Sequence, residues 1–197
     1  MTRPDLRTRL LDALAHAGSA SSDFDLNGDI ALPAGRRLTP AAVLIAVRED
    51  SEAVILTTRS ARLKHHAGQI AFAGGKQDPT DADPIAAALR EAHEEIGLDP
   101  AQVDVVGALH AHETVTGYAI TPVLAIVRGP FEPTPEAGEV SEVFDVPLSH
   151  LVDRARFRVE GRIWQGKMRY YYTVPFGPYY IWGATARILR GLAERMS

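Results

Sequence analysis

The sequence predicts a protein of the α/β (α+β) class, in which helices pack against a mixed β-sheet. Three observations support this prediction. Apolar runs of the β type outnumber helical patterns along the 197 residues. One sharply bounded helical pattern lies mid-chain between two groups of strand patterns, which favours a mixed sheet. Hydrophobic residues make up 46% of the chain and charged residues 23%, a composition typical of folded globular proteins.

The first expected element is an amphipathic helix near the N-terminus. Leucines recur at helical spacing after Pro4, a residue that suits a first helical turn, and the helix is expected to end near Gly18. The stretch that follows is rich in Ser, Asp, Gly and Pro, which is typical of an irregular connection. We therefore expect residues 1–35 to form a helix and a connecting segment, and residues 36–197 to form the main domain.

Strand patterns dominate the rest of the chain. Apolar runs at residues 41–48 and 53–59, separated by a polar turn, predict a β-hairpin. A shorter apolar run leads into the glycine pair Gly74 and Gly75. The later elements are four more β-type runs and a closing helix, expected over residues 103–114, 118–128, 141–146, 169–174 and 181–196.

A helix is expected over residues 84–96, and both of its ends carry local signals. The carboxylate of Asp83 can accept hydrogen bonds from free N–H groups, while Pro84 occupies the first helical position. Gly97 suits a left-handed C-terminal cap. These signals predict where the helix begins and where it ends.

Three glutamates of this helix form a cluster, because Glu91, Glu94 and Glu95 are three or four residues apart. Like charges this close are unfavourable without a cation, and Mg²⁺ or Mn²⁺ prefers such oxygen ligands. Arg90 precedes Glu94 by four residues and can bind its carboxylate. A solvated helix face is the commoner explanation of such a pattern alone. The preceding glycine turn, the caps and the arginine together favour a metal site.

Composition limits the function further. The chain has no cysteine, which excludes disulfides, thiolate metal sites and a cysteine nucleophile. A net charge of -4 argues against a broad nucleic-acid-binding surface, but leaves room for small phosphorylated substrates. No apolar run suits a signal peptide or a membrane span, so we expect a cytoplasmic protein without nucleic-acid or membrane partners.

The segment from Gly75 to Leu98 resembles the Nudix box, G-x5-E-x7-R-E-U-x-E-E-x-G-U, in which U is aliphatic. The first acidic position holds Asp81, and eight residues rather than seven separate it from the arginine. The resemblance therefore assigns no function to Asp81 or to the nearby Asp78. The C-terminal part of the box matches at Arg90, Glu91, Glu94, Glu95 and Gly97.

The longer spacing, together with the upstream run LTTRSARLKHHAGQIAFAGG, is similar to the coenzyme A pyrophosphatase branch of that family. Lys64 stands where this branch usually has arginine, and Ala73 where it usually has proline. The resemblance extends from about residue 41 to the C-terminal helix. The upstream matches are Arg59, Ser60, Leu63, His66, Gly68, Gln69, Phe72, Gly74 and Gly75.

The resemblance implies an α/β/α sandwich and an enzyme that hydrolyses coenzyme A, or an acyl derivative, to adenosine 3′,5′-bisphosphate and 4′-phosphopantetheine. The implied cofactor is Mg²⁺ or Mn²⁺. Glu91 and Glu95 would be direct metal ligands, Glu94 a third ligand or a base, and Arg90 would orient them. A pyrophosphatase for another nucleotide such as ADP-ribose, and a noncatalytic nucleotide-binding module, are the alternatives.

Other candidates lie outside the helix. Glu139 is our candidate for an additional catalytic carboxylate, although Glu136 and Glu142 compete for that role and loop acids are usually solvated. The tyrosines and tryptophans near the C-terminus suit core or homodimer contacts, or stacking on an adenine. The candidates for substrate binding are Arg59, Lys64, His66, Gly74 and Gly75.

Overall fold

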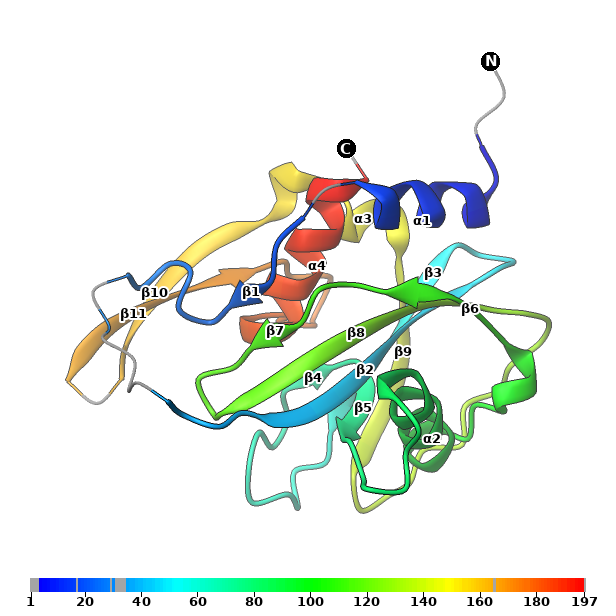
Figure 1. Cartoon of the computed structure of the whole chain (residues 1–197), viewed down its shortest axis with the longest axis horizontal. Helices are drawn as coiled ribbons and strands as arrows, with labels where there is room; N and C mark the ends of the chain where they lie inside the picture. Colours follow the sequence, from blue (N-terminus) through cyan, green and yellow to red (C-terminus); the bar gives the residue numbers. More distant parts are fainter. Residues whose placement is uncertain (1–3, 17, 29, 31–34, 165, 197) are drawn as a thin grey trace.

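The computed structural model describes residues 4–16, 18–28, 30, 35–164 and 166–196. A twisted mixed sheet forms the centre of the molecule (Figure 1). Helices α1 (Leu6–Ala15), α3 (Leu148–Leu151) and α4 (Gly183–Arg195) lie over one face of this sheet, and α2 (Pro84–Ile96) lies over the other. The predicted α+β class with a mixed sheet is thus confirmed.

The central sheet has β2 (Thr39–Arg48) at its middle. Along its whole length β2 pairs in parallel with β8 (Tyr118–Val127), and it pairs antiparallel with β3 (Ala53–Arg59) and β5 (Ala73–Lys76). The remaining strands of this sheet extend it on both sides, and they are β1 (Ser21–Ser22), β4 (Ile70–Ala71), β6 (Val103–Ala108), β7 (His112–Glu113) and β9 (Val140–Pro147).

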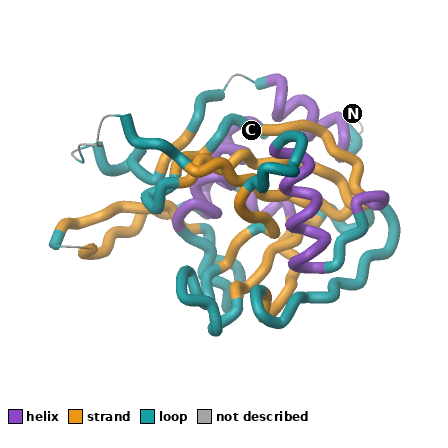
Figure 2. Tube along the Cα trace, turned by 60° about the horizontal axis from the view of Figure 1, so that its bottom comes forward, coloured by secondary structure: helices purple, strands orange, loops and turns teal. Residues whose placement is uncertain are grey.

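Two further strands, β10 (Arg158–Trp164) and β11 (Lys167–Thr173), form a separate antiparallel hairpin. It extends away from the body of the molecule in both views (Figures 1 and 2). The strand pattern at 169–174 predicted β11, but β10 was not predicted, because Gly161 and three charged residues interrupt its apolar pattern.

Alternation along the strands divides the core into two layers. On β2, Leu44 and Ala46 face α2, where they pack with Ala88 and other small residues of that helix. The intervening Ile45 and Val47 face the opposite layer, formed by α1, α3 and α4. The small side chains of α2 allow the helix to lie close to the sheet.

Local sequence signals set several element limits. The 41–48 and 53–59 runs form the predicted hairpin, with Val47 opposite Val54, and the helix spans 84–96 as expected. The first helix ends at Ala15 rather than near Gly18, because His16 has an extended backbone (φ -65°, ψ 132°). A boundary near residue 35 stays a prediction.

Helix α1 packs through Leu10 on the same core as α4. In the described ranges, no helix is both long and apolar enough to cross a bilayer.

Candidate active site

Helix α2 presents its acidic residues at the edge of the glycine turn. The Asp83 carboxylate accepts a hydrogen bond from the Ala86 N–H at 2.8 Å, and Gly97 ends the helix with a left-handed φ of 71°. These caps fix where the helix begins and ends. They therefore also fix which turn of the helix lies beside the loop formed by Gly74 and Gly75.

Glu95 is the most buried of the three glutamates, with only 4% of its side chain exposed. Its Oε2 accepts a hydrogen bond from the backbone N–H of Gly74 at 3.0 Å, and its Oε1 lies 3.8 Å from Nη1 of Arg59. Burial raises the pKa of Glu95 to about 7, although these two contacts oppose the shift. A carboxylate with such a pKa exchanges a proton near neutral pH.

The two glycines before α2 are required for different reasons. At Gly74 the backbone has a φ of 154°, and a Cβ atom would lie 2.4 Å from the carbonyl oxygen of Ala42. At Gly75 a Cβ atom would lie 2.5 Å from the carboxylate of Glu91. Gly74 therefore permits β5 to pair with β2, and Gly75 permits the Glu91 carboxylate to lie against the loop.

Arg90 joins four acceptors at the exposed edge of the site. Its Nε and Nη2 donate to the two carboxylate oxygens of Asp81, each at 3.0 Å, and Nη2 also donates to the carbonyl oxygen of Lys76 at 3.2 Å. Its Nη1 donates to Glu91 at 3.0 Å and to Glu94 at 2.9 Å. The predicted contact between Arg90 and Glu94 is confirmed.

The sequence did not predict a role for Asp81, and the structure shows that its carboxylate binds Arg90. Hydrogen bonding to Arg90 lowers the pKa of Asp81, and the same bond raises the pKa of Arg90. Two parallel N–H···O bonds hold the guanidinium in one plane, and this fixes the direction of its third nitrogen toward the glutamates. The signal in the sequence was an acid at the first acidic position of the box, despite the spacing.

The three glutamates of this cluster differ in how far each side chain is exposed to solvent. The side chain of Glu94 is 58% exposed, that of Glu91 is 16% exposed, and that of Glu95 is buried. Burial also raises the pKa of Glu91. The acidic face thus runs from solvent at Glu94 to the interior at Glu95.

Among the three candidate loop acids, the structure brings Glu139 to the site. The Ser60 N–H donates to the carbonyl oxygen of Glu139 at 2.8 Å, which holds this loop beside the end of β3. The charge of Glu139 contributes to the raised pKa of both Glu91 and Glu95. Glu142 instead accepts a hydrogen bond from the Tyr179 hydroxyl at 2.8 Å.

The chemistry of this cluster fits a hard divalent cation. Glu91, Glu95 and Glu139 offer only oxygen atoms, and each charge raises the energy of the others in a partly buried place. No group of three Asp, Glu or His side chains in the described part of the chain already surrounds a point where a metal would bind. Arg90 occupies one oxygen of Glu91 and one of Glu94 instead.

The predicted substrate-binding side chains separate into two groups. Arg59 contacts Glu95 and belongs to the acidic site. Lys64 and His66 lie exposed on the loop after β3, where His66 has a positive φ of 58° and its Nδ1 lies 2.9 Å from Oε1 of Gln69. Within the described ranges, no hydrogen bond or ion pair joins either side chain to α2.

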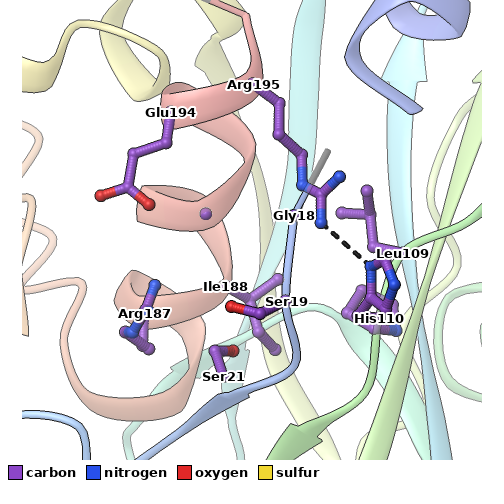
Figure 3. A pocket seen from close by; sticks show the side chains of 11 residues that line it. Gly18, Ser19, Ser21, Leu109, His110, Arg187, Ile188, Glu194 and Arg195 are labelled. Atoms are coloured by element: carbon purple, nitrogen blue, oxygen red, sulfur yellow. Dashed lines mark hydrogen bonds between the residues drawn. The ribbon is translucent and has the colours of Figure 1, made fainter. Parts of the chain in front are cut away.

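A hollow of about 160 Å³ lies between α4 and the neighbouring strands, on the face of the sheet opposite to α2 (Figure 3). There Nη2 of Arg195 meets Nδ1 of His110 at 3.1 Å. Nearby, the buried His112 bonds to Ser21 and to Asp23 at 2.9 and 3.1 Å. These contacts fasten the segment after α1 to the sheet, and the hollow is not part of the acidic site.

Several known proteins are similar to this chain in sequence. Residues 38–167 match the NUDIX domain family. The chain is 42% identical over 154 residues to the Nudix hydrolase NudL of Escherichia coli K12, described as uncharacterized, covering 78% of this chain and 80% of the relative. NudL of Shigella boydii serotype 4 matches to the same extent, with 42% identity.

A solved structure is also similar in fold. The crystal structure of a NUDIX hydrolase from Alicyclobacillus acidocaldarius superposes with a TM-score of 0.50 at 18% identity, over 82% of this chain and 93% of that one. At this identity the likeness concerns the fold alone.

Proposed function

Since this chain belongs to the Nudix hydrolase family and is thereby an enzyme that cleaves pyrophosphate bonds, we propose that its substrate is coenzyme A or an acyl derivative. The products would be adenosine 3′,5′-bisphosphate and 4′-phosphopantetheine. The observation that carries the proposal is the contact of Arg59 with Glu95, which joins the upstream motif to the acidic helix.

The loop that follows Arg59 supports this substrate class. It carries Arg62, Lys64, His65 and His66 within a few residues, all exposed to solvent. Coenzyme A, unlike ADP-ribose, carries a 3′-phosphate on its adenosine, which calls for cationic or hydrogen-bonding partners beyond those for the pyrophosphate. A cationic loop that starts at the acidic site can supply them.

Enzymes of this family generally require divalent metal ions. Here Glu91 and Glu95 would hold the cation, with Glu94 or Glu139 as an additional carboxylate. When bound, Mg²⁺ or Mn²⁺ neutralises the pyrophosphate oxygens and makes a nearby water more acidic.

The chain's own residues position these groups. The Gly74 N–H holds Oε2 of Glu95, and Arg90, itself held by Asp81, holds Glu91 and Glu94. In the hydrolysis a water oxygen bonds to one phosphorus while the bridging P–O bond breaks. A carboxylate of this cluster accepts the water's proton.

The test is a hydrolysis panel with Mg²⁺ and with Mn²⁺. It contains coenzyme A, dephospho-coenzyme A, ADP-ribose, diadenosine polyphosphates and nucleoside triphosphates. We expect the highest kcat/KM for coenzyme A, with adenosine 3′,5′-bisphosphate as a product. A preference for another member would reject the coenzyme A assignment, and binding of coenzyme A without any product would favour a noncatalytic module.

A loop variant makes the test sharper. Lys64→Ala should raise the KM for coenzyme A about tenfold through a lost charge-assisted contact, and should leave dephospho-coenzyme A unaffected. Lys167→Ala, which removes an exposed lysine on the separate hairpin, is the matched control. Equal effects of Lys64→Ala on both substrates would contradict recognition of the 3′-phosphate by this loop.

A further inference from the structure

The β10–β11 hairpin has an exposed apolar face. Directly opposed residues of an antiparallel pair lie on the same face, so Gly161 and Tyr170 share a face with Ile163 and Met168. Ile163 is 73% exposed, and Met168 and Tyr170 are each 48% exposed. Val159, 52% exposed, continues this face toward the body of the molecule.

The other face of the hairpin has partners within the chain. The guanidinium of Arg162 lies 4.8 Å from the ring centre of Trp182, and the Tyr180 hydroxyl donates to Glu160 at 2.6 Å. Part of that face is therefore covered, whereas the apolar side chains Ile163 and Met168 are largely exposed.

The two long edges of the hairpin also differ. The edge of β11 is capped by Asn27, whose side chain donates to the Tyr170 carbonyl oxygen at 2.9 Å and accepts from the Tyr170 N–H at 2.8 Å. The backbone groups of Tyr170 thus point away from β10. Those of the opposed Gly161 must likewise point away from β11.

The N–H and C=O groups of Val159, Gly161 and Ile163 therefore lie along the outer edge of β10, because backbone direction alternates along a strand. No strand in the described part of the chain pairs with this edge. The pairing of β10 with β11 shows no bulge, and β10 contains no proline, so two devices that commonly block strand edges are missing from β10.

We propose that a second copy of this chain pairs with that edge, β10 against β10 in antiparallel orientation, about a two-fold axis at Gly161. Gly161 then lies opposite the partner's Gly161, and Val159 lies opposite the partner's Ile163, so all the outward backbone groups bond between copies. The two apolar faces join into one, and Val159 packs on the partner's Ile163.

The charges on β10 favour this register, and they favour a second copy of the chain as the partner strand. The sequence of β10, Arg-Val-Glu-Gly-Arg-Ile-Trp, places Glu160 opposite the partner's Arg162 when the axis is at Gly161. Moving the axis by one residue places either Glu160 or Arg162 opposite its own copy, which is destabilising. An isologous interface needs such self-complementarity, which β10 provides on both sides of its centre.

The experiment measures molar mass by light scattering across a wide concentration range, with the full chain. The wild type should approach twice the mass of one chain as the concentration rises. Glu160→Arg and Arg162→Glu each oppose like charges twice per dimer and should raise the dissociation constant about tenfold. The double swap, E160R/R162E, should restore association.

The double swap also separates the dimer contact from contacts within one chain. It lacks the Glu160 bond to Tyr180 just as Glu160→Arg does, so the loss of that bond cannot account for a difference in association between these two variants. Ile163→Lys should weaken association, whereas Leu11→Lys, which alters an exposed apolar residue of α1, should not. Circular dichroism and the Tm verify the fold of each variant.

Three results would overturn the proposal. One is a wild type that stays monomeric at all concentrations, and another is a double swap as weak as the single variants. The third is a monomer whose hairpin binds vesicles containing phosphatidylserine, with binding lost in Ile163→Lys, since the apolar face would then bind a lipid surface.

Discussion

Replacing Glu95 with glutamine should remove a pH-dependent cost from folding. Burial raises the pKa of this side chain from 4.5 to about 7, so the folded state binds its proton more tightly than the unfolded chain does. Below the unfolded pKa both states are protonated and Glu95 costs nothing. As the pH rises from about 4.5 to about 7, the unfolded chain releases this proton while the folded chain keeps it, so the free energy of unfolding falls by up to about 3 kcal/mol and then levels off.

The magnitude between two practical pH values follows from the same shift. From pH 5 to pH 8, the wild-type free energy of unfolding should fall by about 2 to 3 kcal/mol through Glu95 alone. Glu95→Gln lacks the ionisation, while its amide oxygen can still accept the Gly74 N–H bond. From pH 5 to pH 8 the free energy of unfolding of Glu95→Gln should therefore fall by about 2 to 3 kcal/mol less than that of the wild type.

The assay is urea unfolding followed by circular dichroism at several pH values in the presence of EDTA. Glu94→Gln is the matched control, because that side chain is 58% exposed, and it should follow the wild-type pH dependence. If Glu95→Gln and the wild type lose stability in parallel from pH 5 to pH 8, the inference that Glu95 is strained by burial is wrong.

Further predictions concern the glycine turn, the arginine anchor and the metal. Gly75→Ala should lower kcat/KM about 10- to 100-fold with little change in Tm, because its Cβ displaces the Glu91 carboxylate. The Cβ of Gly74→Ala would instead collide with the backbone of β2, so this variant should lose about 1 to 3 kcal/mol of stability. Unfolding and activity assays compare the two variants, and equal Tm values would contradict the distinction. Asp81→Asn should release Arg90, and should thereby raise the half-saturating Mg²⁺ concentration or lower kcat about 10- to 100-fold. If the Mg²⁺ titration of this variant matches that of the wild type, Asp81 does not position Arg90 for metal binding. EDTA should abolish hydrolysis, and added Mg²⁺ or Mn²⁺ should restore it in the product assay; persistent activity would exclude the metal mechanism.

Local sequence determined much of the scaffold. Asp83, Pro84 and Gly97 act on the backbone within a turn of their own positions, so the limits of α2 were predictable. The β2–β3 hairpin was predictable for a similar reason, since a short polar turn joins two apolar runs. The order of arginine and glutamates in α2 likewise identified the family before any contact was known.

Only the tertiary structure decided how the acids differ. Helical spacing puts Glu91, Glu94 and Glu95 in one cluster, but burial depends on the sheet below, and it isolates Glu95 from water. Arg59 and Asp81 reach the site across loops whose paths the sequence does not fix. The unpaired edge of the C-terminal hairpin was equally hidden, because pairing between strands is a long-range property that no local pattern encodes.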